Sequence, residues 1–236
     1  MNMQCVILAG GIATRLRPIT EKIAKSMVRI KDKPFLEYQI ELLRKNDVAN
    51  IILCIGYLGK QIEDYFENGK KFGVEIKYSY EKEQLLGTGG TMRNALDLLN
   101  NNFFVLYGDS YLDINYRKAY NYFLKINYPA LLVVYKNENK WDKSNVVFKD
   151  GIVEMYNKKN QIHEMEYIDY GLSILSKDII EEIPKDTFYD LADLYKDLAK
   201  RKNLGGYEVF NRFYEIGSVK GLEDFENFIM KGGHKL

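Results

Sequence analysis

The sequence of 236 residues has little cysteine, no long apolar run and almost no net charge. Its two cysteines, Cys5 and Cys54, sit in apolar runs, which indicates small buried side chains and excludes a disulfide framework. No CxxC pair is present, and no apolar run approaches the ~20 residues that a membrane-spanning helix needs. The formal net charge of +1 excludes a global field that would attract nucleic acid or an anionic membrane.

The start of the sequence also lacks the basic and apolar segments of a secretory signal peptide, because Gly10 and Gly11 interrupt the first apolar run. We therefore expect a cytoplasmic protein that has neither a membrane nor a nucleic acid as its partner. The hydrophobic fraction of 46% and the charged fraction of 28% are typical of globular proteins. A chain of this length predicts one α/β domain over residues 1–236. The oligomeric state stays open.

Apolar runs alternate with amphipathic segments along the first part of the chain. We expect strands over residues 4–9, 50–56, 75–80 and 102–107, and helices over residues 33–46, 58–68 and 90–99. Such alternation predicts a Rossmann-like, mostly parallel sheet flanked by helices, with ligands at the carboxyl ends of its strands.

The second part of the chain is richer in strands and predicts a mixed sheet. An Asp150-Gly151 hairpin is expected between strands 146–148 and 152–156. Further strands are expected over residues 130–135, 168–175 and 207–216, and helices over residues 115–127, 179–183, 191–201 and 222–230. Gly205-Gly206 is interpreted as the break between the third helix and the last strand.

The first strand opens into a glycine loop that is followed by basic residues. Gly10 and Gly11 permit a sharp turn whose backbone N–H groups can hold phosphates, and Arg15 and Lys25 add positive charge. An ordinary tight loop is the alternative interpretation. No Gly-Lys-Ser/Thr follows, which excludes a Walker A loop, and the spacing excludes the GxGxxG of dinucleotide-binding oxidoreductases.

The longer segment around this loop points to a family. Leu-Ala-Gly-Gly-x-x-Thr-Arg-Leu-x-Pro at residues 8–18, followed by Lys25-Ser26-Met27 and by Lys-Pro-Phe-Leu-Glu-Tyr at residues 33–38, resembles the signature of the sugar-1-phosphate nucleotidyltransferases. The resemblance covers nearly the whole chain and is strongest to single-domain heptose and mannose 1-phosphate guanylyltransferases. Two positions depart from the pattern. Ala13 replaces a glycine, which constrains the loop if φ must be positive there, and Ala24 replaces a proline, which leaves the Lys25 segment less rigid.

The resemblance implies roles for the nucleotide-binding half, residues 1–110. Arg15 would bind the β- and γ-phosphates, and Lys25 would lie near the α-phosphate and the leaving pyrophosphate. A second glycine cluster at residues 86–91 would line the nucleobase pocket with free backbone amides, preceded by Glu81 and Gln84, which either read a base edge or are solvated loop residues. The nucleotide-binding candidates are Leu8, Ala9, Gly10, Gly11, Thr14, Arg15, Lys25, Glu81, Gly87 and Thr88.

Two carboxylates are candidates for holding a divalent metal. Asp109 follows an apolar strand and a glycine, so it would face the ligand crevice, although a turn or a helix cap is the alternative. Tyr214-Glu215-Ile216-Gly217 resembles the family segment that carries the second metal ligand, with Glu215 in place of Asp. A strand-edge surface residue is the alternative for Glu215. The expected cofactor is Mg²⁺ or Mn²⁺, and the expected catalytic residues are Arg15, Lys25 and Asp109.

The sugar-phosphate-binding half, residues 111–236, carries the acceptor candidates. By resemblance Lys159 would hold the phosphate of the sugar 1-phosphate, and Asp169 would accept hydrogen bonds from its hydroxyls. Lys158 stands where the family has a Glu, and a solvated hairpin end is the alternative for the two lysines. The substrate-binding candidates are Gly108, Asn145, Lys159, Asp169 and Gly171. His163 and His234 lack metal-ligand spacing, and both are expected at the surface or in a loop.

These features together predict an enzyme of nucleotide-sugar biosynthesis, for example for cell-surface polysaccharides. It would join an NTP, with GTP favoured, to a heptose or hexose 1-phosphate and release pyrophosphate, using Mg²⁺-assisted in-line attack on the α-phosphate. Two alternatives remain open. One is a cytidylyltransferase for a non-sugar phosphate such as phosphocholine, and the other is a non-catalytic regulator that binds a nucleotide sugar.

Overall fold

The computed structural model describes residues 3–81 and 86–234, and its contacts divide the chain into two compact units. The first unit comprises Met1–Gln84, Leu106–Asp113 and Phe213–Leu236, and the second comprises Leu85–Val105 and Ile114–Arg212. The chain therefore does not divide at residue 110, because its last segment returns to the first unit. The single domain over residues 1–236 stays a prediction.

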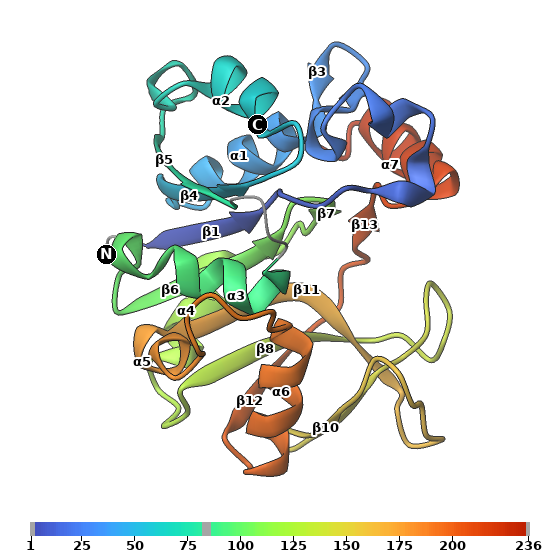
Figure 1. Cartoon of the computed structure of the whole chain (residues 1–236). Helices are drawn as coiled ribbons and strands as arrows, with labels where there is room; N and C mark the ends of the chain where they lie inside the picture. Colours follow the sequence, from blue (N-terminus) through green and yellow to red (C-terminus); the bar gives the residue numbers. More distant parts are fainter. Residues whose placement is uncertain (1–2, 82–85, 235–236) are drawn as a thin grey trace. The chain divides into compact units, whose positions relative to one another are not determined.

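A parallel sheet forms the centre of the first unit. Its strands follow the order β5-β4-β1, where β1 is Gln4–Leu8, β4 is Asn50–Ile55 and β5 is Glu75–Tyr80. The described side chains of β1 and β4 are almost all buried, as the apolar runs predict. The helices α1 (Phe35–Lys45) and α2 (Gly59–Phe66) lie beside these strands in Figure 1. Parallel strands and helices in alternation confirm the α/β pattern expected for this part of the chain.

Short elements complete the first unit around α1. The strands β2 (Arg29–Ile30) and β3 (Lys33–Pro34) pair, so α1 begins at Phe35 and not at Lys33 as predicted. The short 3-10 helices are η1 (Thr14–Leu16), η2 (Ile19–Glu21), η3 (Lys25–Met27) and η4 (Lys70–Phe72). From the distant segments come β7 (Ser110–Tyr111), β13 (Tyr214–Glu215) and α7 (Val219–Met230).

An aromatic cluster fixes α7 in the first unit. The ring of Phe225 is fully buried, and its centroid lies 5.0 Å from those of Phe35 and Tyr111. His234 follows α7, and its Nε2 lies 2.8 Å from Glu41 while its Nδ1 lies 2.7 Å from the Tyr111 hydroxyl. Only 7% of the His234 side chain is exposed, so the expectation of a surface histidine there is wrong. Its hydrogen-bond partners come from α1 and β7, which the sequence pattern does not connect to the end of the chain.

The second unit contains a mixed sheet in the order β6-β11-β8-β12-β10-β9. Of its neighbours, β8 and β12 are parallel, whereas β11 with β8, β10 with β12, and β10 with β9 are antiparallel. The strands are β6 (Asn102–Tyr107), β8 (Ala130–Lys136), β9 (Val146–Lys149), β10 (Ile152–Tyr156), β11 (Tyr167–Ser176) and β12 (Leu204–Val209). Parallel and antiparallel pairs confirm the expected mixed sheet.

Two glycine-containing segments test the turn predictions in this unit. Asp150 and Gly151 have φ of 49° and 80°, the pair of positive values that a tight hairpin between β9 and β10 requires. The predicted break at Gly205-Gly206 is wrong, because both residues lie within β12. A side chain at Gly206 would place its first carbon 2.4 Å from the ring of Phe148. Close packing against an aromatic ring, not a chain break, therefore explains this glycine.

Helices of the second unit pack against this sheet. The α6 helix lies along β10 and β12, as Figure 1 shows, and the buried side chains of α6 confirm its amphipathic pattern. The α3 helix begins three residues earlier than predicted, and the expected strand over residues 207–216 is instead the end of β12 and the separate β13. The helices are α3 (Gly87–Asn94), η5 (Leu96–Leu98), α4 (Tyr116–Phe123), α5 (Lys177–Glu181) and α6 (Leu191–Lys200).

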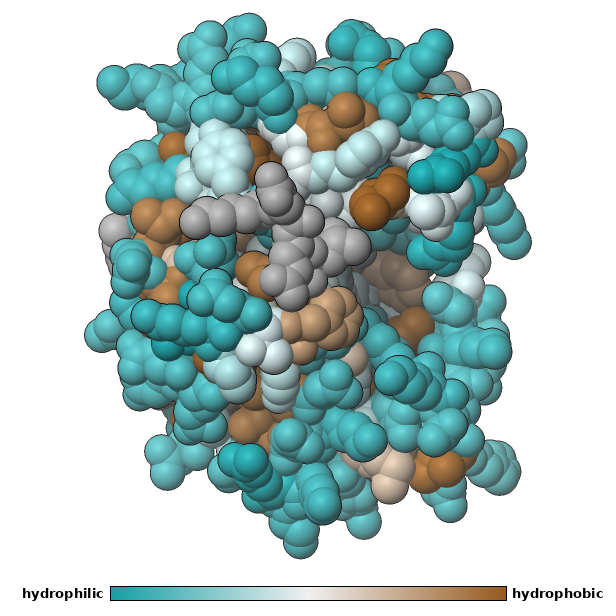
Figure 2. Space-filling view, in the orientation of Figure 1, coloured by the Kyte–Doolittle hydropathy of each residue, from teal (hydrophilic) through white to brown (hydrophobic). Residues whose placement is uncertain are grey.

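The surface offers little continuous apolar area on the face drawn in Figure 2, where hydrophobic residues are scattered among hydrophilic ones. Within residues 3–81 and 86–234, no helix is long and apolar enough to cross a membrane.

Ala13 adopts a left-handed backbone conformation in the loop after β1. Its φ is 53° and its ψ is 52°, and its carbonyl accepts a 2.7 Å hydrogen bond from the Thr20 hydroxyl. A left-handed conformation costs an L-residue about 1–2 kcal/mol because Cβ crowds the neighbouring carbonyl. The φ of position 13 is therefore positive, as the family glycine suggested, and the alanine constrains the loop there.

Ala13→Gly should increase the free energy of unfolding by about 1 kcal/mol, because relief of this crowding exceeds the entropy that glycine adds to the unfolded chain. Urea denaturation at unchanged m-value measures the effect. Ala24 has φ of −56° and gains nothing from glycine, so Ala24→Gly is the matched control and should destabilise the protein. Equal destabilisation by both substitutions would contradict the interpretation of Ala13.

Candidate active site

A short ion pair joins two of the predicted catalytic residues in the first unit. The Lys25 Nζ lies 2.5 Å from the Asp109 Oδ2, although the two residues are 84 positions apart in the sequence. Lys25 begins η3, and Asp109 stands in the turn between β6 and β7. The side chains are 17% and 31% exposed, so the pair remains open to a ligand from solvent.

Glu215 joins this charged cluster through the pairing of two very short strands. Glu215 is opposite Ser110 in the β13–β7 ladder, and the Ile216 N–H donates to the Asp109 carbonyl at 2.9 Å. The Ser218 hydroxyl donates to the Glu215 Oε1 at 2.8 Å, and the Gly217 N–H donates to Oε2. Ser218 also caps α7, so the start of this helix orients the carboxylate.

Gly217 shows how closely these charges approach one another. A first side-chain carbon at Gly217 would lie 2.5 Å from the Glu215 Oε2 and 3.1 Å from both the Arg15 Nη2 and the Lys25 Nζ. Any larger residue would therefore enter the space that two cations and a carboxylate share. The first unit thus brings together all four charged residues predicted to act on the triphosphate and the metal: Arg15, Lys25, Asp109 and Glu215.

The two carboxylates of this cluster fit a hard divalent cation. Mg²⁺ is usually held by one or two carboxylates together with phosphate oxygens. Asp109 and Glu215 supply that number, and they lie beside cations that can hold the phosphates. Among the described residues, no group of three or more His, Cys, Asp or Glu side chains lies together so that it could hold a metal ion.

The first glycine loop lies at the carboxyl end of β1. The Ala9 N–H donates to the Cys54 carbonyl at 2.8 Å, and the Leu8 carbonyl accepts from Gly108 at 3.0 Å, so both residues are held by neighbouring backbone. Gly11 is exposed, and a side chain there would meet no atom within 4 Å. Thr14 and Arg15 are also exposed, on η1. The loop from Gly10 to Arg15 is therefore the part that remains available to a ligand.

Glu81 stands at the carboxyl end of β5, against this loop. A first side-chain carbon at either Gly10 or Gly56 would lie 3.0 Å from the Glu81 Oε2. Burial, with a smaller contribution from Glu81, raises the pKa of the Cys54 thiol to about 12, so that thiol stays neutral. Glu81 thus places a carboxylate at the glycine loop. Gln84, the other predicted base-reading residue, lies outside the described residues.

The second glycine cluster differs from its prediction. The backbone N–H groups of Gly89 and Gly90 both donate to the Tyr189 carbonyl, at 2.8 and 3.0 Å. The Thr88 hydroxyl lies 2.8 Å from the Asp190 carboxylate. The expectation that the amides of this cluster are free to read a base edge is therefore wrong for Gly89 and Gly90, which bind the segment before α6. Gly87 is the first residue of α3, and its φ is 69°.

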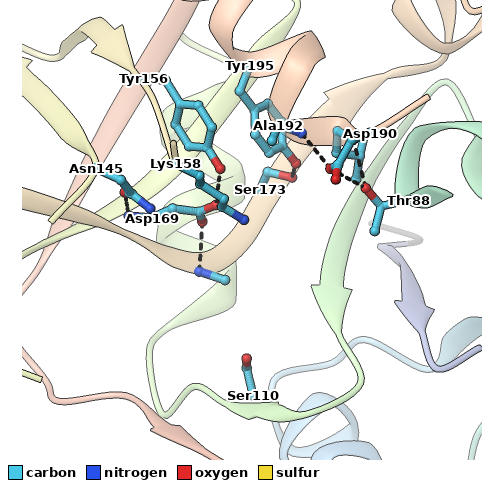
Figure 3. Close-up of polar contacts among 12 residues, drawn as sticks. Thr88, Ser110, Asn145, Tyr156, Lys158, Asp169, Ser173, Asp190, Ala192 and Tyr195 are labelled. Carbon is cyan, nitrogen blue, oxygen red and sulfur yellow. Dashed lines mark hydrogen bonds and ion pairs between the residues drawn. The ribbon is translucent and has the colours of Figure 1, made fainter. Parts of the chain in front are cut away.

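Asp169 is the centre of a polar group in the second unit. Only 3% of its side chain is exposed, and its carboxylate accepts from the Tyr156 hydroxyl and the Gly171 N–H, each at 2.9 Å. Figure 3 shows Tyr156 and Lys158 pointing toward this carboxylate. The Asn145 Oδ1 accepts from the Asp169 N–H at 2.8 Å, so Asn145 positions the same residue. Three acceptor candidates, Asn145, Asp169 and Gly171, are therefore brought together.

The two lysines after β10 have different surroundings. The Lys158 Nζ lies 3.7 Å from the Asp169 Oδ2. The Lys159 side chain is exposed, and its backbone N–H donates to the Asn157 Oδ1 at 3.0 Å. Lys158 is thus a cation beside the buried carboxylate, and the phosphate-binding role of Lys159 stays a prediction.

Several positioning contacts were missed from the sequence. The Gln39 Nε2 donates to the carbonyls of Tyr107 and Ser110, at 2.9 and 2.7 Å, and so holds both sides of the Gly108-Asp109 turn. Gln39 is 1% exposed and occupies a position in the apolar stripe of α1. A polar residue within such a stripe is the signal that would have identified it. For Tyr156, which donates to Asp169, no comparable signal exists.

Comparisons with known proteins identify the family to which the chain is similar. A family model described as "Nucleotidyl transferase" matches residues 4–232. The chain is 31% identical over 229 residues to a D-glycero-alpha-D-manno-heptose 1-phosphate guanylyltransferase of Campylobacter jejuni, with 97% of this chain and 99% of that protein covered. It is 30% identical to the mannose-1-phosphate guanylyltransferase catalytic subunit beta of Xenopus tropicalis, covering 92% of this chain but 62% of that protein.

A solved structure shows the same fold. The crystal structure of HddC from Yersinia pseudotuberculosis complexed with GMP-PN is 26% identical, with a TM-score of 0.80 and coverage of 96% of this chain and 99% of that one. The α/β fold predicted from the sequence is therefore confirmed. With the family model matching nearly the whole chain, this protein belongs to the nucleotidyl transferase family, and the prediction of an enzyme resembling the sugar-1-phosphate nucleotidyltransferases is confirmed.

Proposed function

We propose that this chain transfers the nucleoside monophosphate of an NTP, with GTP favoured, to a heptose or hexose 1-phosphate and releases pyrophosphate. The carrying observation is the convergence of Arg15, Lys25 and Glu215 around Gly217, together with the Lys25–Asp109 ion pair. Clustered cationic side chains bind a polyphosphate, and carboxylates bind a divalent metal. This cluster supplies both kinds of group. The names of the relatives support the sugar phosphate and the guanine nucleotide.

The proposed reaction needs no nucleophile or base from the protein. An oxygen of the sugar 1-phosphate, anionic near pH 7, forms a bond to the α-phosphorus. The bond from the α-phosphorus to the oxygen bridging the β-phosphate breaks, and its electron pair leaves with pyrophosphate. Arg15 holds the β- and γ-phosphates, and Lys25 offsets the charge that develops on the leaving group. Catalysis then comes from position and electrostatics.

Asp109 and Glu215 would hold the divalent ion, Mg²⁺ or Mn²⁺. When bound, this ion offsets negative charge on the triphosphate and on the departing pyrophosphate. The Lys25 ammonium group lies beside the same Asp109 carboxylate. Gln39 keeps the Asp109 turn in place, and Ser218 orients Glu215.

Glu81 supports a guanine base. The guanine edge carries N1–H and N2–H as adjacent donors, which match the two oxygens of a carboxylate. Cytosine presents one donor beside an acceptor, and uracil presents one donor between two carbonyls, so a carboxylate would repel part of either edge.

Release of pyrophosphate across a panel of NTPs and sugar 1-phosphates tests the whole proposal. Phosphocholine with CTP belongs in the panel as the non-sugar alternative, and absence of turnover with every pair would favour a non-catalytic regulator.

Asp109→Asn should reduce pyrophosphate release by ~1000-fold or more while the fold persists, because metal charge stabilisation is worth several kcal/mol. Steady-state kinetics and Mn²⁺ titration by calorimetry measure turnover and metal affinity separately. Asp113→Asn, on the same segment, is the matched control and should retain activity. Wild-type-like activity in Asp109→Asn would overturn the metal assignment.

Glu81→Gln should raise KM for GTP ~10- to ~100-fold, because it replaces a carboxylate that accepts two charge-assisted hydrogen bonds. KM values for UTP and CTP should change less, so the ratio of kcat/KM between the nucleotides reports the effect. Glu75→Gln removes a carboxylate from the other end of β5 and serves as control. An unchanged nucleotide preference in Glu81→Gln would show that another group reads the base.

Lys159→Met should raise KM for the sugar 1-phosphate about tenfold and leave KM for the NTP unchanged, because it removes one charged hydrogen-bond donor. Lys158→Met tests the lysine that lies beside Asp169. Lys149→Met, at the opposite end of the same hairpin, is the control. A rise in KM for Lys158→Met alone would transfer the phosphate-binding role from Lys159 to Lys158.

A further inference from the structure

Gln61 on α2 holds the chain directly before Lys25. Its Nε2 donates to the Lys22 carbonyl at 2.8 Å, and its Oε1 accepts from the Ala24 N–H at 3.0 Å. One side-chain amide thus satisfies a donor 37 residues earlier and an acceptor 39 residues earlier, both in the same loop. Ala24 itself is 2% exposed, so its N–H has little access to water as an alternative partner.

These two hydrogen bonds fix the position of the backbone directly before Lys25. Ala24 is the residue before η3, and Met27 donates back to the Ala24 carbonyl at 2.8 Å. Lys25, the next residue, carries the ammonium group that pairs with Asp109. The Tyr57 hydroxyl donates to the Glu21 carbonyl at 3.1 Å, so the same loop is held at a second point close to the start of α2. A shift of the loop relative to α2 would therefore move Lys25.

The backbone of Ala24 is already in the conformation that proline would adopt. Its φ of −56° and ψ of 139° lie in the region to which a pyrrolidine ring restricts the chain. Proline at position 24 would remove the N–H that donates a hydrogen bond to the Gln61 Oε1. Rigidity at this point can therefore come from a hydrogen bond to Gln61 or from a ring at position 24, but not from both.

We propose that Gln61 is a positioning residue for Lys25, and that its bonds to Lys22 and Ala24 supply the rigidity that places the ammonium group for triphosphate chemistry. The proposal rests on the proposed nucleotidyl transfer for its kinetic consequence. Its structural consequence, the immobility of residues 22–27, is independent of turnover.

Gln61→Leu should lower kcat ~10- to ~100-fold, because small misplacements of a catalytic group have effects of this size. The inhibition constant for pyrophosphate should rise, since Lys25 serves the leaving group. KM for the sugar 1-phosphate should not change. Hydrogen exchange of the amides of residues 22–27 should accelerate. Lys60→Met, on the same helix with a 73% exposed side chain, is the control and should leave all four quantities unchanged.

A second substitution separates positioning from mere stability. Ala24→Pro alone should lower kcat, because the ring removes the N–H and faces the Gln61 oxygen. In the Gln61→Leu background the same change should restore most of the lost kcat, since the ring fixes φ and meets an apolar side chain. Melting temperatures at matched conditions identify any loss that comes from unfolding.

The outcomes are distinct. Recovery in the double variant supports the proposal, and a double variant no better than Gln61→Leu overturns it. Faster exchange at residues 22–27 with unchanged kcat in Gln61→Leu also overturns it, because the loop would then be mobile without consequence for Lys25. If the wild-type chain releases no pyrophosphate, the proposed function fails. Binding of inorganic pyrophosphate to the same variants then tests the positioning of Lys25 without turnover.

Discussion

The pairing of two short strands, β7 and β13, brings the charged residues Asp109 and Glu215 together. β7 and β13 come from segments about a hundred residues apart, and their ladder places Glu215 opposite Ser110, next to Asp109. So short a ladder has little stability of its own. The aromatic cluster around Phe225 supplies it, because Tyr111 of β7 and Tyr214 of β13 both contact that ring. Apolar packing thus holds Asp109 and Glu215 close to Arg15 and Lys25, where we propose that a polyanion and a metal bind.

Much of the fold was predictable because its signals are local. An apolar run that ends in glycine marks the strands at Gln4 and Asn102, and polar residues at the carboxyl ends of buried strands identify Asp109 without any contact information. The hairpin at Asp150-Gly151 follows from its dipeptide alone. In each case a few consecutive residues contain the whole physical cause.

Other features depend on partners that no local pattern identifies. Gly206 is a strand residue because Phe148 packs against it, although two adjacent glycines usually indicate a break. The amides of Gly89 and Gly90 would be free in an isolated loop, but the Tyr189 carbonyl, a hundred residues later, accepts from both. Propensity is a weak guide wherever such tertiary contacts decide the outcome.

Three residues that depart from the family pattern, Ala24, Lys158 and Glu215, each make a contact that explains how the structure accommodates them. The Ala24 N–H, which a proline would lack, donates a hydrogen bond to the Gln61 side chain. Lys158, in place of an acidic residue, lies beside the buried carboxylate of Asp169, where a second negative charge would be repelled. Glu215, longer than the expected aspartate, is oriented by Gly217 and Ser218, directly before α7. Because each substitution has a partner that accommodates it, these departures are consistent with a retained reaction whose loop rigidity and acceptor pocket are built differently. They give no support to a protein that has lost these charges, since Arg15, Lys25 and Asp109 are all present for the roles that we propose.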